Sequence, residues 1–361
     1  MKAVILVGGE GTRLRPLTLI TPKSMVPVVN RPFLEHMVKY LQRHRINDIV
    51  LALCYLPDAI QRYFGDGNSF GIKLAYAIED SPLGTAGAVK NVCEHVIDTF
   101  FVLNGDVFTD INLTEMLQFH RQKKSIATIA LTTVKDPSMY GVIETNVEGR
   151  VQRFVEKPNR GEVTSNTINA GVYILEPRVL ELVPKNQKFM FERGVFPVLV
   201  ERGEPVYGYK ATNAYWVDIG TPEKYKMLHY DLLSGKVERE LPGEEIGEQI
   251  WIEGNVDVSP KARIKGPVVI GEKCAVGAGA YIKGPSSIGS DCTIGSGSVI
   301  EKAIIWNNSR LGQKTSLKGC VVANNVSIGD RAQVPEGCVL GHDVILGSDE
   351  KLKRNTNVWP K

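Results

Sequence analysis

Short apolar runs alternate with stretches of helical spacing over the first 235 residues of the chain. The segment 32–44 is typical of a helix, because Phe33, Met37, Val38 and Leu41 recur at a period near 3.6. Strands are expected over 2–7, 48–53, 73–78 and 100–104, and helices over 32–44, 57–64 and 85–96. This alternation predicts an α/β domain with a doubly wound, mostly parallel sheet. Further strand-like segments at 126–134, 141–145, 151–156 and 168–175 predict a layer added onto that sheet.

A different pattern begins near residue 251, where aliphatic residues recur at every sixth position. The series is Ile264, Ile270, Val276, Ile282, Ile288, Ile294 and Ile300, and after a shift of phase Leu311, Leu317, Ile328, Val334, Leu340 and Leu346. Small or β-branched residues recur four positions after the early members, as Val268, Cys274, Ala280, Ser286, Cys292 and Ser298. Hexapeptide repeats build parallel β-helices, in which three hexads close one coil and the anchors point inward.

The two patterns predict two domains with a link between them. We expect the α/β domain over 1–235, a charged, turn-rich linker over 236–250 and the β-helix over 251–361. A length of 361 residues agrees with two domains.

Composition removes several classes of function. A formal net charge of +3 is too near neutral to produce the positive electrostatic potential that attracts nucleic acid. No apolar stretch approaches the roughly 18 residues of a membrane span, and the apolar start is too short for a signal peptide. We therefore expect a cytoplasmic protein without nucleic-acid or membrane partners. The six cysteines form no CxxC pair, which favours buried thiols over a zinc site.

A glycine-rich segment directly follows the first expected strand. Gly8, Gly9 and Gly11 allow a close approach of backbone N–H groups to anionic oxygens, and Arg13 adds a guanidinium suited to phosphate. The segment is neither a Walker A loop nor a dinucleotide motif, because no GK[ST] closes it and Leu14 stands at the third glycine position. The alternative is a structural tight turn.

Three further charged residues suit a phosphate site, one as a contact to phosphate and two as ligands of its metal ion. Lys23 follows Pro22 and is a point charge for phosphate, although a solvated lysine is the simpler interpretation taken alone. Asp106 follows the strand 100–104, where ligands of open α/β sheets bind, and is a natural Mg²⁺ ligand. Asp218 stands inside a short apolar run and offers a second carboxylate, with a helix N-cap as its alternative role.

Together these residues resemble the nucleoside-diphosphate-sugar pyrophosphorylases, the sugar-1-phosphate nucleotidyltransferase family. The resemblance spans nearly the whole chain. Its ordered motifs are G-G-x-G-T-R-L-x-P-L-T at 8–18, P-K at 22–23, G-D at 105–106, E-K-P at 156–158, N-A-G at 169–171 and D-I-G at 218–220. Ser24 replaces the proline that usually follows P-K. The resemblance implies a Rossmann-like catalytic domain and a left-handed β-helix.

The resemblance also implies a role for each motif. The triphosphate would be held by Gly8, Gly9, Gly11, Thr12 and Arg13, with Lys23 on the α-phosphate, and Leu6 would also contact the nucleotide. Asp106 and Asp218 would hold Mg²⁺, and the sugar phosphate would contact Gly141, Glu156, Lys157 and Asn169. For Glu156 and Lys157 the alternative is an exposed ion pair at a strand end. The implied reaction joins a nucleoside triphosphate to a sugar 1-phosphate and releases pyrophosphate.

The base is expected at Glu79, Gly84 and Thr85, in the segment where the family reads it. Guanine presents two adjacent donors that a carboxylate accepts, whereas thymine and uracil present one donor between two acceptors. Glu79 therefore favours guanine, unless it is an exposed loop acid. The segment LGTAG at 83–87 also resembles the mannose-1-phosphate guanylyltransferase branch. A thymidylyl- or uridylyltransferase acting on glucose 1-phosphate is the alternative.

Two rival functions remain open. A catalytically silent regulatory homologue is disfavoured by the presence of Arg13, Lys23, Asp106 and Asp218. An acyltransferase built on the β-helix would need a histidine base, and the repeat region holds only His342, which we expect at the surface. The β-helix is more simply an assembly surface, and we expect a homodimer or higher homo-oligomer.

Overall fold

The computed structural model describes residues 1–159, 162, 165–237 and 239–360. The chain forms two compact units, each discontinuous in sequence. The first comprises Met1–Glu10 and His36–Val217, and the second comprises Gly11–Glu35 and Asp218–Lys361. Each unit is described by itself below.

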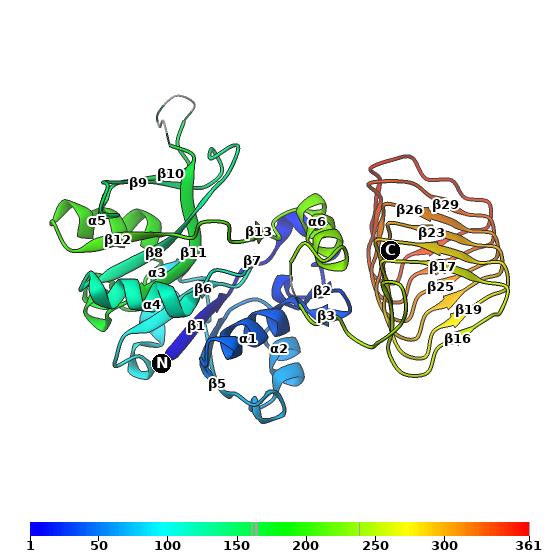
Figure 1. Ribbon diagram of the computed structural model, residues 1–361, viewed down its shortest axis with the longest axis horizontal. Helices are drawn as coiled ribbons and strands as arrows, with labels where there is room; N and C mark the ends of the chain where they lie inside the picture. Colours follow the sequence, from blue (N-terminus) through cyan, green and yellow to red (C-terminus); the bar gives the residue numbers. More distant parts are fainter. Residues whose placement is uncertain (160–161, 163–164, 238, 361) are drawn as a thin grey trace. The chain divides into compact units, whose positions relative to one another are not determined.

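A nine-stranded sheet forms the centre of the first unit (Figure 1). Its parallel part has the order β6-β1-β4-β5. The strands are β1 (Lys2–Val7), β4 (Asp48–Leu53), β5 (Lys73–Ile78) and β6 (Phe100–Asn104), which are the four expected ranges. Ala3, Val4 and Ile5 are all fully buried, so both faces of β1 are covered, which explains its continuous apolar run.

The later strands extend this sheet and do not form the separate layer expected from the sequence. They are β8 (Ala127–Thr133), β9 (Gly141–Thr145), β10 (Val151–Glu156), β11 (Thr167–Leu175) and β12 (Val206–Lys210). β11 is antiparallel to β6, β8 and β9, and β10 is antiparallel to β9. The sheet therefore continues as β10-β9-β11 beyond β6, with β8 and β12 also joined through β11.

Most of the α-helices bury apolar residues against the sheet, whereas Pro222–Leu233 belongs to the second unit and contacts Ser286–Ile288 there. The α-helices are α1 (Phe33–Arg43), α2 (Pro57–Phe64), α3 (Gly84–Asn91), α4 (Leu113–Gln122), α5 (Phe196–Glu201) and α6 (Pro222–Leu233). Ala86 and Val89 of α3 share one apolar cluster with Val4, Val50 and Val102 of the parallel strands. The expected helix over 85–96 ends earlier, and a 3-10 turn at Cys93–His95 replaces its last part.

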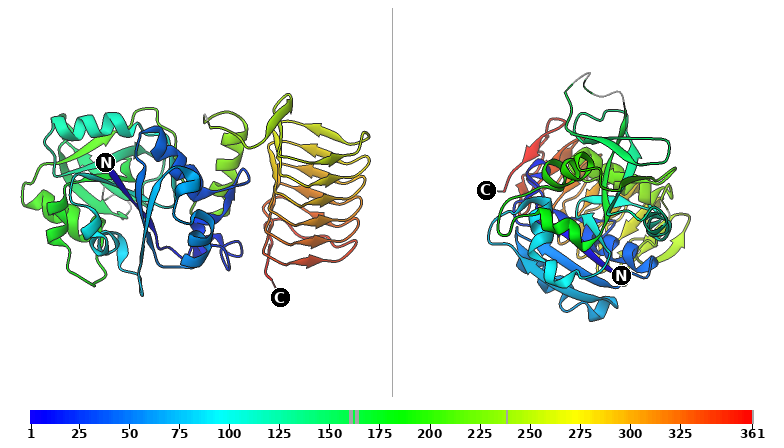
Figure 2. Two further views of the ribbon diagram at one scale, coloured as in Figure 1. Left: turned by 90° about the horizontal axis from the view of Figure 1, so that it is seen from below. Right: turned by 90° about the vertical axis from the view of Figure 1, so that its left-hand side faces the viewer.

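Stacked coils form a left-handed parallel β-helix in the second unit (Figure 2). One of its three sheets consists, in spatial order, of β14 (Glu244–Gly247), β15 (Ile250–Ile252), β18 (Val268–Ile270), β21 (Ser286–Ile288), β24 (Ile304–Ile305), β27 (Val321–Val322), β30 (Val339–Leu340) and β32 (Asn357–Val358). The second sheet consists of β16 (Asp257–Val258), β19 (Ala275–Val276), β22 (Thr293–Ile294), β25 (Arg310–Leu311), β28 (Ser327–Ile328) and β31 (Ile345–Leu346). The third consists of β17 (Arg263–Lys265), β20 (Tyr281–Lys283), β23 (Val299–Glu301), β26 (Ser316–Lys318) and β29 (Gln333–Val334). The strands are two to four residues long. Ile264 pairs in register with Ile282, and Ile282 with Ile300, so one coil takes three hexads as predicted.

The shift of phase in the repeat has a local cause. Ile288 stands opposite Ile305, and Leu317 stands opposite Val334, so these coils are one residue shorter than the coil between Ile264 and Ile282. Ile305 is therefore an anchor that a strict spacing of six passes over. Val322 is missed for the same reason. Both side chains are buried in the apolar interior of the β-helix.

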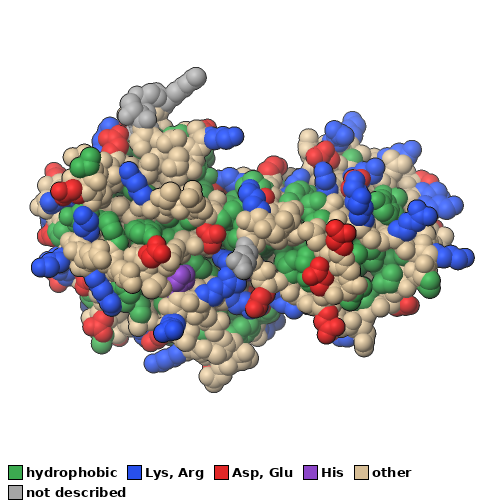
Figure 3. All heavy atoms as spheres, viewed as in Figure 1, with side chains coloured by type: hydrophobic (Ala, Val, Ile, Leu, Met, Phe, Trp, Pro, Cys, Tyr) green, Lys and Arg blue, Asp and Glu red, His purple; other side chains and the backbone are tan. Residues whose placement is uncertain are grey.

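The structure also bears on the expected linker, the cysteines, the absence of a membrane span and the distribution of charge. β14 (Glu244–Gly247) lies within the expected linker and pairs antiparallel with β15 (Ile250–Ile252). All six cysteines are free thiols. Among the described residues, helices are too short or too polar to cross a membrane. Acidic and basic side chains are both spread over the face drawn in Figure 3.

Candidate active site

The candidate residues of the first unit gather at one edge of its sheet. Three of the four parallel strands end next to one of them, since β6 leads into Gly105-Asp106, β1 into Gly8 and β5 into Glu79, whereas β4 leads into Cys54. Leu6 lies opposite Asn104, Val7 opposite Leu53, and Leu53 opposite Ile78, so these ends are level. The carboxyl ends of such strands are where open α/β sheets bind ligands.

Glu79 lies at the β5 end of this edge and is 7% exposed, so it is not an exposed loop acid. Its Oε2 accepts a hydrogen bond from Leu83 N at 2.9 Å. Burial raises the pKa of the Glu79 carboxyl, and the hydrogen bond from Leu83 lowers it by less. Cys54 follows the neighbouring strand β4. Burial, and then the nearby charge of Glu79, raise the pKa of the Cys54 thiol. A side chain at Gly8 would come within 3.3 Å of Cys54 Cβ.

Asp106 lies in the middle of the edge and is half-buried. Gly105 N donates to Leu6 O at 2.9 Å, and a Cβ on Gly105 would lie 2.4 Å from that oxygen. Only glycine therefore lets the chain turn here and bring Asp106 next to the start of the glycine-rich segment. Asn104 Oδ1 is buried without a hydrogen-bond partner in the described part of the chain, which indicates a position where a ligand or water donor fits.

Gly141, Glu156 and Asn169 meet beyond β6 through strand register. Gly141 pairs directly with Glu156, and a Cβ on Gly141 would lie 2.9 Å from Glu156 Oε2. Ile168 pairs with Val142, which brings Asn169 to the same edge. Burial and then the neighbouring Glu192 raise the pKa of Glu156, whereas Lys157 lowers it. Glu156 is half-buried and Lys157 exposed.

Glu192 is a candidate that sequence reasoning missed. It is 8% exposed and lies in a π-helical turn, Phe191–Val195. Its carboxylate accepts hydrogen bonds from Thr85 Oγ1 at 2.7 Å and from Tyr173 OH at 3.3 Å. Asn169 Nδ2 in turn donates to Tyr173 OH at 2.8 Å. Thr85 is therefore placed in a polar network with Asn169, although the sequence assigned it to the base. No motif marks Glu192, because it is adjacent to these groups only in the fold.

The rest of the glycine-rich segment belongs to the second unit. Gly11 has φ of +65°, and Thr18 Oγ1 donates to its carbonyl at 2.7 Å. A Cβ on Gly11 would lie 3.0 Å from Lys23 Cβ, so the segment folds back and carries Lys23 past Gly11. The structure thus brings together two residues that the sequence assigned separately to phosphate. Thr12 and Arg13 are exposed.

Asp218 and Arg13 lie on either side of Gly220. A Cβ on Gly220 would lie 2.5 Å from Asp218 Oδ1 and 3.0 Å from an Arg13 guanidinium nitrogen. Asp218 Oδ1 accepts from Gly220 N, and Oδ2 forms an ion pair with Lys224. Thr221 caps α6, since its Oγ1 accepts from Lys224 N, so Asp218 is not the N-cap. An acidic group 8% exposed is thus held by charged and backbone donors.

Asp106 of the first unit and Asp218 of the second are each a carboxylate that could serve as a Mg²⁺ ligand beside a substrate. No group of three or more His, Cys, Asp or Glu side chains that could hold a metal occurs among the described residues. Mg²⁺ needs only one or two carboxylates, because phosphate oxygens and water complete its shell. The donor set, oxygen-only and partly exposed, fits that requirement.

The parallel sheet, with candidate residues at the carboxyl ends of its strands, agrees with a nucleotidyl-transferring enzyme. Residues 2–235 match the family model described as nucleotidyl transferase, and the chain belongs to that family. Residues 247–352 match the model of the LbH domain, the left-handed β-helix, of the EIF2B epsilon subunit.

Individual relatives cover most or all of the chain. The mannose-1-phosphate guanylyltransferase of Mycobacterium tuberculosis is 38% identical, over 77% of each chain. The mannose-1-phosphate guanylyltransferase catalytic subunit beta of Danio rerio is 36% identical, over 100% of this chain and 96% of its own. The UTP–glucose-1-phosphate uridylyltransferase of Synechocystis is 37% identical, over 86% and 84%. The crystal structure of HddC from Yersinia pseudotuberculosis with GMP-PN has a TM-score of 0.55 and 32% identity, over 64% of this chain and 99% of that one.

Proposed function

We propose that the protein transfers the guanylyl group of GTP to mannose 1-phosphate, giving GDP-mannose and pyrophosphate. The coarser reaction, nucleotidyl transfer to a sugar 1-phosphate, follows from the family. A uridylyltransferase acting on glucose 1-phosphate is the second candidate, favoured by the Synechocystis relative.

The order of residues along the sheet edge is the observation that supports the reaction. From one end it runs Glu156, Asn169, Asp106, Gly8 and Glu79, following β10-β9-β11-β6-β1-β4-β5. Adjacent strands lie about 4.8 Å apart, so Asp106 and Glu79 are separated by roughly 14 Å across three steps. A nucleotide lying along the edge would have its base at Glu79 and its phosphates near Asp106, with the sugar phosphate beyond.

Guanine is supported by the placement of Glu79. The carboxylate is buried and oriented by Leu83 N, and it can accept from the N1–H and 2-amino donors of guanine. Uracil or thymine would present a carbonyl acceptor to the same oxygens and be repelled. Relatives named for mannose 1-phosphate and guanylyl transfer, over nearly the whole chain, support the same substrates.

The mechanism assigned to the residues is positioning and charge neutralisation. A phosphate oxygen of the sugar 1-phosphate attacks the α-phosphorus of GTP, and the bond to the pyrophosphate leaving group breaks in line. The nucleophile is already an anion, so no protein base is needed. Gly8, Gly9 and Gly11 donate backbone N–H groups, while Arg13 and Lys23 stabilise the developing negative charge.

Mg²⁺ is proposed as the cofactor, held by Asp106 and Asp218. When bound, the ion would neutralise phosphate charge that would otherwise oppose the attack. Glu156 would accept hydrogen bonds from sugar hydroxyls, and Lys157 would pair with the sugar phosphate.

The test is pyrophosphate release with Mg²⁺ from GTP, dTTP, UTP and ATP, each with mannose, glucose and N-acetylglucosamine 1-phosphates. We expect the highest kcat/KM with GTP and mannose 1-phosphate. A preference for UTP or dTTP with glucose 1-phosphate would retain the mechanism and refute the base assignment. Folded protein without turnover on any pair would favour the silent regulatory homologue.

The metal assignment predicts a large loss of turnover in Asp106→Asn with the fold retained. Removing one electrostatic contact to a developing charge costs about 100-fold or more in kcat. We expect such a loss in Asp106→Asn and Asp218→Asn, with a higher Mg²⁺ concentration for half-maximal rate and a thermal unfolding midpoint near that of the wild type. Unfolding of the variants would show that the carboxylates are structural.

Lys224→Met is the matched control for Asp218, because it removes the ion-pair partner and keeps the carboxylate. If Asp218 serves the reaction, the Lys224→Met enzyme retains much more activity than Asp218→Asn. Equal losses in the two variants would indicate that the ion pair, and not metal binding, is the function of Asp218.

A further inference from the structure

The Gly11–Glu35 segment, which carries Arg13 and Lys23, packs in one compact unit with the β-helix. The contacts use residues that follow strands of the eight-stranded sheet: Glu253 after β15 (Ile250–Ile252), Trp306 after β24 (Ile304–Ile305) and His342 after β30 (Val339–Leu340). These strands belong to one sheet, β24 three coils after β15 and β30 two coils after β24, so one side of the β-helix faces the segment. We call these three residues and Ser287–Ile288 of β21 (Ser286–Ile288) the platform.

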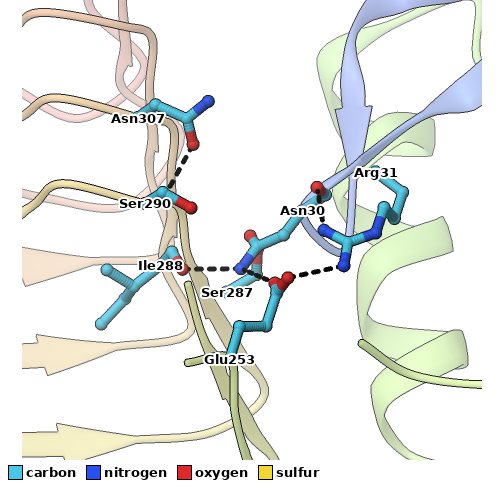
Figure 4. A network of polar contacts seen from close by, with 7 residues as sticks. All are labelled: Asn30, Arg31, Glu253, Ser287, Ile288, Ser290 and Asn307. Atoms are coloured by element: carbon cyan, nitrogen blue, oxygen red, sulfur yellow. Dashed lines mark hydrogen bonds and ion pairs between the residues drawn. The ribbon is translucent and has the colours of Figure 1, made fainter. Parts of the chain in front are cut away.

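The turn at Asn30-Arg31 is bound at one end of the platform (Figure 4). Asn30 Nδ2 donates to Ile288 O at 2.7 Å, and its Oδ1 accepts from Ser287 Oγ at 3.0 Å. Arg31 forms an ion pair with Glu253 at 2.6 Å. Asn30 has φ of +62°, a conformation that asparagine tolerates. Both ends of its amide are thus used to fix the turn.

A second contact joins Trp306, through α6, to β2 (Pro27–Val28), the strand that precedes this turn. Trp306 Nε1 donates to Tyr225 OH at 2.9 Å, and Tyr225 OH donates to Pro27 O. Trp306 and Tyr225 are 2% and 0% exposed. This chain of hydrogen bonds reaches the segment just after Lys23.

His342 makes the third contact, just before Lys23. It is 2% exposed, so the expectation of a surface histidine was wrong, and its burial leaves it unavailable as a base for acyl transfer. Nε2 lies 3.0 Å from Leu17 O and 3.2 Å from Thr21 Oγ1. Because a carbonyl only accepts, Nε2 carries the proton. The imidazole packs edge-on to Trp306, with ring centroids 5.4 Å apart. Burial lowers the pKa of His342, which favours this neutral form.

Contacts with the β-helix therefore hold the chain on both sides of Lys23, at Leu17 and Thr21 before it and at Pro27 after it. We infer that the β-helix platform positions the triphosphate-binding segment, and that His342 is a positioning residue for nucleotide binding. The kinetic part of this inference rests on the proposed function. A β-helix serving only for assembly would not need a buried histidine that donates to this segment.

The test compares full-length wild type with His342→Phe, His342→Gln and Ser298→Ala. Phenylalanine keeps a ring against Trp306 but leaves Leu17 O without its donor, whereas glutamine can return an N–H close to the position of Nε2. Ser298 is the matched control, because it is fully buried and its hydroxyl bonds within the β-helix. It donates to Gly312 O at 2.9 Å and accepts from Thr315 N at 3.1 Å and Thr315 Oγ1 at 3.0 Å. The readouts are hydrogen exchange over residues 11–26, the two KM values and the thermal unfolding midpoint.

We expect His342→Phe to raise the KM for GTP by about tenfold, the effect of one lost hydrogen bond on a buried acceptor. The KM for mannose 1-phosphate stays within about twofold, because that substrate does not depend on the segment. Amides of residues 11–26 exchange faster in His342→Phe, and His342→Gln restores most of both values. Ser298→Ala lowers the unfolding midpoint and changes neither readout.

The inference is refuted if His342→Phe lowers only the unfolding midpoint, or if exchange over 11–26 changes equally in Ser298→Ala. Absence of turnover in the wild type would refute the proposed function instead. The exchange measurement would still decide whether His342 holds the segment, since it requires no substrate.

Discussion

At the scale of single residues, burial decides what the candidate side chains can do. Glu79 and Asp106 are both acids that follow parallel strands at one sheet edge. Glu79 is nearly enclosed and has an oriented carboxylate, which suits recognition of fixed donors. Asp106 is half-buried, which suits a group that shares its ligand with water. Two carboxylates at level strand ends thus suit different roles because the two strand ends differ in exposure.

Glu79 gives a prediction about pH. Guanine recognition needs the ionised carboxylate, and burial raises the pKa of this group above its ordinary value of 4.5. As the pH falls, Glu79 therefore gains its proton earlier than an exposed glutamate, and the KM for GTP rises. We expect Glu79→Gln to raise the KM for GTP by about 10- to 100-fold at pH 7.5, the range for a charged hydrogen bond.

The measurement is the KM for GTP between pH 7.5 and 5 in both proteins, with the KM for mannose 1-phosphate as control. Substrate phosphates titrate equally for both, so the rise assigned to Glu79 is the part absent from Glu79→Gln. Parallel pH profiles for the two proteins would exclude Glu79 as the guanine reader.

At the scale of elements, apolar patterning predicted most of the sheet. β1, β4, β5, β6, β9, β10 and α2 have the bounds expected from the sequence. These elements were predictable because each has a short, regular pattern of apolar residues with turn residues at both ends. The β-helix was predicted equally well because each anchor is buried by its counterpart one coil away.

Pairing between distant strands was not predictable from local pattern. β11 joins β6 antiparallel and extends the sheet, because its partner is chosen by the whole fold. Glu192 and His342 were missed as buried polar groups for the same reason. Their partners are 107 residues away, at Thr85, and 325 residues away, at Leu17. The roles of the motif residues themselves stay predictions.

At the scale of the whole molecule, the contacts between residues divide the chain differently from the pattern of its sequence. The hexapeptide repeat begins near residue 251, but residues 11–35 and 218–233 belong to the same compact unit as the β-helix. A boundary read along the chain cannot show this, because the second unit is assembled from two separated segments. Assembly into a homo-oligomer stays a prediction.

Removal of the β-helix should abolish catalysis if it holds the phosphate segment. A chain of residues 1–243 loses Trp306, Glu253 and His342, and leaves Tyr225 and Asn30 without those partners. Misplacement of a binding group by about 1 Å can cost 100-fold in rate, so we expect at least such a loss in pyrophosphate release. Slow hydrogen exchange in β1 and β4 would show that the sheet is still folded. Near-normal turnover by the shortened chain, at any concentration, would mean that the β-helix is needed for assembly alone. A loss reversed by adding the fragment 244–361 would place the effect in the contacts between that fragment and the segment 11–35.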